Sequence, residues 1–236
     1  EINCFWPQDA AERFRALVGR YLHPGILAVI TAHNEIEAVK ANVRILLQEL
    51  KGTASEIVVV DNYSNDGLRE WLTRQADISY VISDERPEGF GSILKTVNEQ
   101  FADGRDLLLL RANSLLTPGS IAALQSALHS GRDIAAAGPV GNALPGEQKC
   151  CPGDTYAEAA EFQKTQEDAT VRTAYLDPDI MLVKGSVRDS LDVDCAVPQA
   201  AMREFMRRVI HEGLCLAVAG KAVCFADTET KDEPYQ

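Results

Sequence analysis

The stretch EIVVVDNYSNDG, residues 56–67, decides the fold of this chain. It joins four consecutive apolar residues, Ile57–Val60, to a turn rich in Asn, Asp, Ser and Gly. A short β-branched run bounded by turn residues is typical of a strand that is buried on both faces of a sheet. Polar residues just beyond such a strand lie where open α/β sheets bind their ligands. The stretch therefore predicts a parallel strand that delivers Asp61 and Asn62 to a site, although a strand ending in a plain tight turn would have the same pattern.

Apolar strands and amphipathic helices alternate along the first 138 residues. Strands are predicted where short apolar runs end in polar residues, at 26–30, 56–61, 78–82, 106–110 and 133–137. Apolar residues at helical spacing predict the intervening helices, at about 39–50, 66–75, 89–102 and from Pro118 onward. This alternation predicts the α/β class, with a mostly parallel sheet, right-handed crossovers and flanking helices. A further helix is predicted over 8–22, within an N-terminal helical segment of residues 1–25.

The pattern is less regular in the second half of the chain. Residues 138–154 are rich in Gly and Pro and predict a long loop. A helix over about 156–168, a strand at 180–183 and an amphipathic helix at 200–212 follow. Two short apolar runs around Gly220, at 214–218 and 222–225, predict a closing pair of strands.

The composition excludes several kinds of partner. The chain carries 35 acidic and 23 basic residues, a net charge of −12, which disfavours nucleic acid and anionic membrane surfaces. No apolar run approaches the length of a membrane span. The six cysteines form no CxxC pair and no zinc spacing with His, and a reducing compartment suits them. We therefore expect a cytoplasmic protein without a nucleic-acid partner or a membrane span.

Four stretches resemble the inverting family 2 glycosyltransferases of the GT-A fold. They are VITAHNE (29–35), VVVDNYSNDG (58–67), PEGFG (87–91) and LLLLRANSLLTPGSI (107–121). PEGFG is similar to the turn of the rhamnosyltransferase-like branch of that family. The resemblance implies one Rossmann-like GT-A domain over residues 26–236, with a nucleotide-binding half at 26–138 and an acceptor half at 139–236. Its implied partners are a UDP- or dTDP-type nucleotide-sugar donor and a saccharide or other hydroxyl acceptor.

The first two stretches hold the nucleotide in that family. The resemblance implies that Thr31, Ala32 and Asn34 lie near the base and ribose. It also implies that Asp61 and Asn62 read a uracil- or thymine-type edge, which carboxylate and amide groups suit chemically.

The Gly-aromatic-Gly turn belongs to the diphosphate in the same comparison. Gly89 and Gly91 allow close approach of the backbone, and the helix N-terminus behind them favours an anion. Lys95, one turn into the helix, is either a further positive charge for the diphosphate or a solvated lysine.

The chain departs from the family at the metal-binding Asp-x-Asp segment, which here reads Arg111-Ala112-Asn113. A divalent cation such as Mn²⁺ or Mg²⁺ needs hard anionic oxygen ligands, and Asn113 offers one neutral carbonyl as the only candidate ligand. Arg111 either neutralises the diphosphate directly, since guanidinium suits phosphate, or merely replaces a lost ligand.

The chain also departs at the family's late Glu-Asp pair, which supplies the general base. Ala201-Met202 aligns with that pair, and Glu204 is the nearest carboxylate and the candidate base. Two residues turn a helical side chain by roughly 200°, so Glu204 is expected to face away from the pair's direction. The sequence does not choose among the other carboxylates of this half, which are Asp177, Asp179, Asp192 and Asp194.

Two functions remain open from the sequence. One is a metal-independent glycosyltransferase in which Arg111 and Lys95 counter the leaving diphosphate. The other is a catalytically inactive GT-A-like binding or scaffold domain of a larger protein. A nucleotidyltransferase-like protein is disfavoured because no Gly-rich, basic triphosphate loop follows the first strand.

Overall fold

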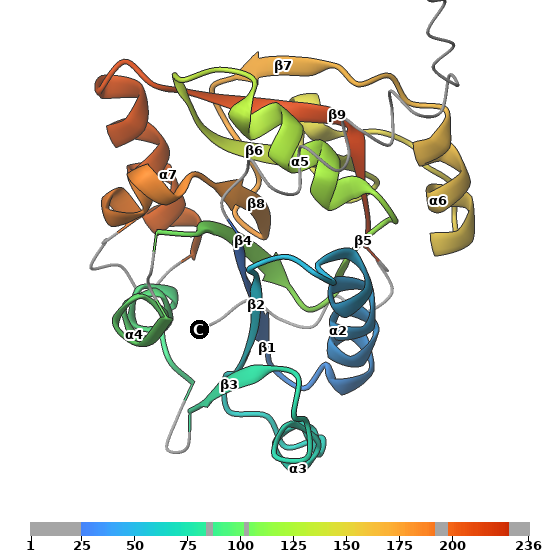
Figure 1. Cartoon of the computed structure of the whole chain (residues 1–236), viewed down its shortest axis with the longest axis vertical. Helices are drawn as coiled ribbons and strands as arrows, with labels where there is room; N and C mark the ends of the chain where they lie inside the picture. The colour runs from blue at the N-terminus through green and yellow to red at the C-terminus, as the bar shows by residue number, and fades with distance from the viewer. Residues whose placement is uncertain (1–24, 84–86, 102–103, 192–197, 227–236) are drawn as a thin grey trace, which may run out of the picture.

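The computed structural model describes residues 25–83, 87–101, 104–191 and 198–226 (Figure 1). The helix predicted over residues 8–22 lies outside the described residues. The described strands form one mixed sheet in the order β3-β2-β1-β4-β8-β6-β9-β5, with β7 paired to β9. The strands are β1 (Ile26–Ala32), β2 (Glu56–Asp61), β3 (Ser79–Ile82), β4 (Asp106–Arg111), β5 (Ser114–Leu116), β6 (Ile134–Gly141), β7 (Thr170–Thr173), β8 (Ile180–Val183) and β9 (Cys215–Ala226).

Helices cover both faces of the sheet. Buried side chains of α2, α3 and α5 pack on one face, and those of α4 and α7 pack on the other, as the two sides of the ribbon show (Figure 1). The helices are α2 (Ile36–Glu49), α3 (Leu68–Leu72), α4 (Phe90–Phe101), α5 (Ser120–His129), α6 (Tyr156–Lys164) and α7 (Pro198–His211), with short 3₁₀ turns η1 (Gly146–Gln148) and η2 (Gly185–Leu191).

The continuous apolar runs of the central strands are explained by this double coverage. In β1, Ile26, Ala28 and Ile30 join the core on the α2 side, whereas Leu27 and Val29 join the core on the α4 side. Successive side chains of a strand point to opposite faces, so a strand covered on both faces needs apolar residues at every position. The pairing of β1 with β2 and β4 in parallel register brings the carboxyl ends of these three strands to one edge of the sheet.

The structure confirms the α/β class and the first four predicted strands, and it corrects four details of the sequence prediction. The fifth predicted strand, within β6, does not lie beside the first four, because β8 is inserted between β4 and β6 and runs antiparallel to both. The region predicted as a loop from residue 138 continues as β6 to Gly141. The strands β5 and β7 have only three and four residues and were not predicted.

The prediction of two closing strands at 214–218 and 222–225 was also wrong, because β9 is one strand of 12 residues. Gly220 does not form a turn within it. Instead its backbone N–H donates to the Ala169 carbonyl at 2.8 Å, so the segment before β7 provides the hydrogen-bond acceptor for Gly220. β9 pairs with β6 along its length, with β7 through its first half and with β5 at its end.

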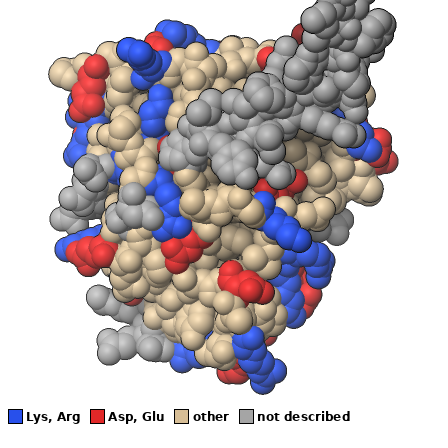
Figure 2. Space-filling view, viewed as in Figure 1, with Lys and Arg blue, Asp and Glu red and all other residues tan. Residues whose placement is uncertain are grey.

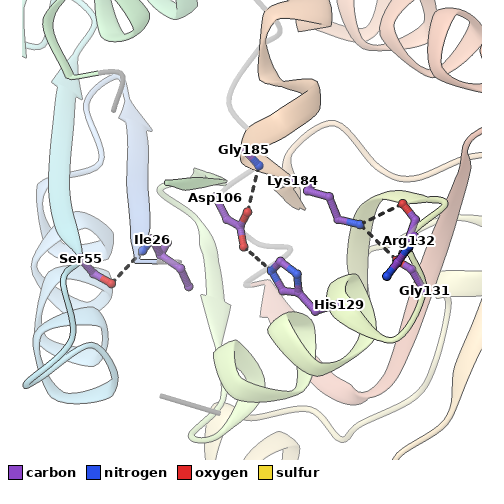
Figure 3. Close-up of polar contacts among 8 residues, drawn as sticks. All are labelled: Ile26, Ser55, Asp106, His129, Gly131, Arg132, Lys184 and Gly185. Atoms are coloured by element: carbon purple, nitrogen blue, oxygen red, sulfur yellow. Dashed lines mark hydrogen bonds and ion pairs between the residues drawn. The ribbon is translucent and has the colours of Figure 1, made fainter. Parts of the chain in front are cut away.

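Asp106, Lys184 and Ser55 form hydrogen bonds at the amino edge of the sheet (Figure 3). The buried Asp106 accepts a hydrogen bond from the Gly185 N–H at 2.9 Å through Oδ1, and its Oδ2 lies 2.6 Å from His129 Nε2. Lys184 Nζ donates to the Gly131 carbonyl at 3.1 Å, and Ser55 Oγ accepts from the Ile26 N–H at 2.8 Å. This edge joins β4, α5 and the start of η2 through satisfied polar contacts.

Candidate functional site

The loops that follow β1 and β2 are bound to each other at the carboxyl edge. The Asn34 N–H donates to Ser64 Oγ at 3.0 Å, and Asn34 Oδ1 accepts from the Asn65 N–H at 2.7 Å. Asp66 Oδ2 accepts from the Ile36 N–H at 2.8 Å, at the start of α2. These bonds make one rigid polar surface out of the two stretches that the sequence singled out.

Two residues of these loops have left-handed backbones. The φ angles are 60° for Asn34 and 67° for Tyr63, and they are the only non-glycine residues with positive φ in the described chain. Asn tolerates this conformation, whereas an aromatic residue there is uncommon and costs energy. Strain of this kind clusters at binding and catalytic sites. Tyr63 is 46% exposed.

Asp61 is the last residue of β2, and only one of its two carboxylate oxygens accepts a hydrogen bond from a described residue. Its Oδ1 accepts from the Ser64 N–H at 2.9 Å. Its Oδ2 is buried and accepts no hydrogen bond from any described residue, and the whole residue has no exposed surface. Buried polar atoms nearly always have a partner, and one that lacks it asks for an explanation such as an absent ligand.

Asn62 is buried and both ends of its amide are occupied. Its Oδ1 accepts from the Glu88 N–H at 2.7 Å, and its Nδ2 donates to the Glu88 carbonyl at 3.0 Å. The predicted contact between Asn62 and a nucleobase would require this pair to break. In the structure the amide anchors the segment that leads into α4.

The Gly-aromatic-Gly segment enters α4 as the sequence suggested. The Gly89 carbonyl accepts from the Ile93 N–H at 3.2 Å, and Phe90 and Gly91 are the first two helical residues. The N–H groups of a first helical turn have no partner within the helix, so they favour an anion. Lys95 is exposed on this helix and forms no ion pair with any residue of the described chain.

Arg111 ends β4 beside β1. It lies opposite Thr31 in the parallel register, and the Ala112 N–H donates to the Thr31 carbonyl at 3.0 Å. Arg111 Nη1 lies 3.3 Å from Asp179 Oδ2, and the Arg111 N–H donates to the Asp179 carbonyl at 2.8 Å. Ala32 is buried, and its carbonyl accepts from the Asn62 N–H at 2.9 Å.

Residues 111–113, which the resemblance aligns with a metal-binding segment, offer few oxygen ligands to a divalent cation. Arg111 is itself a cation, Ala112 is buried, and the Ala112 carbonyl accepts from Asn42 Nδ2 at 2.6 Å. Within the described ranges, no three or more His, Cys, Asp or Glu side chains are grouped so as to hold a metal ion. Mn²⁺ and Mg²⁺ prefer several anionic oxygens, and Asn113 alone does not provide them.

Two acidic residues before β8, in the second half of the chain, lie at the same edge. Asp177 Oδ1 accepts from the Asp179 N–H at 2.9 Å, and the Asp177 N–H donates to the buried Gln148 at 2.7 Å. Burial, together with the charge of Asp179, raises the pKa of the Asp177 carboxyl to about 6. Burial also raises the pKa of Glu35, which lies beside Arg111 at the exit of β1. Glu35 stands in the quoted VITAHNE stretch but was not predicted as a site residue, and its place directly after a strand was the available signal.

The predicted base position on α7 has a different environment. Ala201 and Met202 are buried in the core on the α4 side of the sheet. Glu204 accepts from Arg207 at 2.8 and 2.9 Å and from Arg208 at 3.0 Å, all on its own helix. These arginine hydrogen bonds lower the pKa of Glu204 to about 2, which makes its carboxylate a weak base. Within the described residues, the hydrogen bonds of Glu204 are to arginines of its own helix, whereas Asp179 contacts both Arg111 and Asp177 at the carboxyl edge.

A surface cavity of about 440 Å³ lies at the other edge of the sheet. Its lining includes Leu47, Leu50, Ile57 and Ile78 from α2, β2 and the start of β3. None of the predicted site residues lines it. Burial and the neighbouring Cys151 raise the pKa of the Cys150 thiol to about 11, so Cys150 is not poised as a thiolate at neutral pH.

The surface charge agrees with the composition. Figure 2 shows acidic and basic side chains interspersed over the visible described surface, without one broad basic area. Among the helices in the described ranges, none is both long and apolar enough to cross a membrane.

Solved structures with the same fold share this arrangement of strands and helices. "Crystal structure of GalNAc-T7 with UDP, GalNAc and Mn2+" aligns with a TM-score of 0.66 and 16% identity, over 86% of this chain and 44% of that chain. "Mannosyltransferase PcManGT from Pyrobaculum calidifontis in complex with GDP-Man and Mn2+" aligns with a TM-score of 0.64 and 17% identity, over 94% of this chain and 65% of that chain. The domain is therefore an α/β domain of the GT-A glycosyltransferase fold.

The family follows from the sequence. The family model for glycosyl transferase family 2 matches residues 27–149, just over half of the 236 residues, and the chain belongs to that family. No curated protein matches the sequence. The chain spans less than two thirds of the length of both solved structures.

Proposed function

We propose that this chain binds a UDP- or dTDP-type nucleotide sugar at the carboxyl edge of its sheet and transfers the sugar to a hydroxyl acceptor with inversion. Membership of glycosyl transferase family 2 supports the reaction class. The PEGFG turn at 87–91 supports a place in the rhamnosyltransferase-like branch of that family.

The single observation that carries the proposal is the unpaired Oδ2 of Asp61. A carboxylate oxygen accepts hydrogen bonds, and Oδ1 is already occupied by the Ser64 N–H. Uracil and thymine present one ring N–H between two carbonyls, so they offer one donor to one free oxygen. Guanine presents two adjacent donors and would leave one of them without a carboxylate oxygen. Because Asp61 has no exposed surface, the surrounding chain must open to admit the base.

The remaining groups suit a diphosphate. The N-terminus of α4 follows Gly89, and Asn62 fixes its approach through Glu88. Arg111 would exchange part of its contact with Asp179 for the phosphate oxygens, where a guanidinium can bind in bidentate fashion. In this proposal the positive charge of Arg111 stands where family members use a cation, and Thr31, Ala32 and Asn34 line the base and ribose.

Calorimetric titration of the whole chain with UDP, dTDP and GDP, each with and without Mn²⁺, tests the proposal. We expect UDP or dTDP to bind more tightly than GDP, with an affinity that Mn²⁺ changes little. Asp61→Asn should weaken that binding about tenfold or more, because it removes a charge-assisted hydrogen bond of roughly 1.5–3 kcal/mol. Asp77→Asn is the matched control, since it makes the same change at an exposed residue of the amino-edge cavity. Equal affinities of the two variants would remove Asp61 from the site.

A binding domain without turnover is the second candidate, and the environment of α7 favours it. Ala201 and Met202 cannot supply a base, and Glu204 is held by two arginines. Tight nucleotide binding without release of sugar from any UDP- or dTDP-hexose would support this second function.

A further inference from the structure

We infer that Asp177, in the segment before β8, is the base that takes the proton from the acceptor hydroxyl. This inference rests on the proposed function. It assigns the base to a part of the chain that is remote in sequence from the α7 position of the family.

The topology places Asp177 at the required edge. Because β8 runs antiparallel to β4, the residues before β8 lie beside the residues that end β4. Asp179 therefore meets Arg111 directly, and Asp177 lies two residues further out from the strand. The diphosphate side and the acceptor side of the site come together at this point.

Asp177 is held in place but keeps one oxygen for chemistry. Its backbone N–H is fixed by Gln148, whose side chain is buried and donates to the Pro139 carbonyl at 2.9 Å. Oδ1 accepts from the Asp179 N–H, and no described residue donates to Oδ2. A base needs this combination of a fixed position and an oxygen that is available to the substrate.

The neighbouring carboxylates are less suited. Asp179 is paired with Arg111. Glu35 lies on the nucleotide half, and its Oε2 accepts from the His33 N–H at 3.3 Å. Asp192 and Asp194 lie outside the described residues.

The electrostatic surroundings of Asp177 favour proton uptake near neutral pH. The titratable and charged groups that act on it or feel its charge are Asp179, Arg111, Tyr175 and Cys224. Burial is the largest cause of its raised pKa of about 6. Catalytic bases work best when their pKa lies near the working pH. Tyr175 is 38% exposed beside it and offers an aromatic face to a sugar acceptor.

The proton and electron balance of the step is simple. The acceptor oxygen forms a bond to the anomeric carbon while its proton passes to Asp177 Oδ2. The bond from the anomeric carbon to the diphosphate oxygen breaks, and its electron pair leaves with the nucleoside diphosphate. The proton on Asp177 is then lost to solvent, and no oxidant or further reactant is needed.

Release of UDP or dTDP from donor sugars tests the inference with water as the acceptor, so that the natural acceptor need not be known. The donor is the member of a UDP- and dTDP-hexose panel that the wild-type chain hydrolyses fastest. Asp177→Asn keeps the Oδ1 acceptor and should lower kcat about 10²–10⁴-fold. UDP affinity should stay within about twofold. The wild-type rate should fall below pH about 6, and the residual rate of Asp177→Asn should lose that dependence.

Asp177→Glu and Asp77→Asn are the matched variants. Asp177→Glu should restore part of the rate, which a purely structural role would not predict. Asp77→Asn makes the same carboxylate-to-amide change at an exposed residue of the amino-edge cavity, and it should retain the rate and the fall below pH about 6. A wild-type rate in Asp177→Asn, or an equal loss of rate in Asp77→Asn, would overturn the assignment.

The test separates the two proposals. Failure of the wild-type chain to bind UDP or dTDP overturns the proposed function, and the inference about Asp177 with it. Nucleotide binding without turnover of any donor overturns the assignment of Asp177 as a base and leaves the donor site in place. Binding and turnover that survive Asp177→Asn overturn only the assignment.

Discussion

The two edges of the sheet treat a buried aspartate in opposite ways. At the amino edge, both oxygens of Asp106 are engaged, one by the Gly185 N–H and one by His129 (Figure 3). At the carboxyl edge, one oxygen of Asp61 is buried without a hydrogen-bond partner among the described residues, and the carboxyl of Asp177 has a raised pKa. A buried oxygen without a hydrogen bond lowers the stability of the folded state. The carboxyl edge therefore carries a free-energy cost at Asp61 that Asp106 at the amino edge does not.

This difference teaches where to look for function. Satisfied polar contacts join β4, α5 and η2 into one frame at the amino edge. The carboxyl edge combines an unpaired oxygen, two left-handed residues and three neighbouring carboxylates around Arg111. Binding sites concentrate such features because ligands, rather than the fold, complete them.

The largest expected effect on stability is at the amino edge. Asp106→Ala removes the acceptor of two hydrogen bonds inside the protein and should lower the free energy of unfolding by about 3 kcal/mol. Urea denaturation at pH 7 measures this loss. Nucleotide affinity of the folded fraction should be unchanged, and a fall in affinity would break the division between the two edges.

A smaller effect is expected from Asn62, which links the carboxyl edge to α4. Asn62→Ala removes both hydrogen bonds to Glu88 and should cost about 1–2 kcal/mol of stability. Nucleotide affinity should fall as well, because the α4 N-terminus loses its anchor. Denaturation and calorimetry on the same preparation check both quantities. If Asn62→Ala lost nucleotide affinity without losing stability, the result would instead support a direct hydrogen bond between Asn62 and the base, as the family resemblance implies.

The smallest expected effect is a gain in stability. The pKa of Asp177 is raised to about 6 from an ordinary value of 3.8, so the folded state holds the proton more tightly than the unfolded state. The wild-type chain therefore loses stability as the pH rises from about 4 through about 6. Asp177→Asn lacks this loss and should be more stable than wild type by about 1 kcal/mol above pH 6.5, with the difference vanishing near pH 4.

Thermal denaturation of both proteins across this pH range measures the gain. Equal stability of the two proteins at every pH would mean that folding does not disfavour the charged form of the Asp177 carboxyl. The contrast with Asp106, where substitution only destabilises, would then disappear.

The fold of the first half of the chain could be predicted because its signals are local. The apolar runs of β1, β2 and β4 are continuous because both of their faces are covered, and each ends in polar residues. β5, β7 and the full length of β9 were missed because tertiary pairing determines them. β7 has an exposed, polar sequence that forms a strand through its pairing with β9.

The candidate site could be predicted only in part. Asp61 and Arg111 are the last residues of β2 and β4, and they were predicted as site residues from the strand pattern and the family resemblance. The hydrogen bonds between the Asn62 amide and the Glu88 backbone join residues that are 26 apart in the sequence, so only the folded structure shows them. Asp177 was one of four carboxylates that the sequence could not rank, since only the pairing of β8 with β4 brings it beside Arg111.

The reversed direction of β8 has a consequence for reading related sequences. In a sheet of parallel strands, catalytic and binding residues are usually looked for directly after the carboxyl end of each strand. An inserted antiparallel strand presents its entrance at the same rim, so the residues that lead into it become part of the working surface. Acidic residues upstream of such strands, as in the Asp-Pro-Asp of 177–179, are therefore candidates that a search of strand exits would overlook.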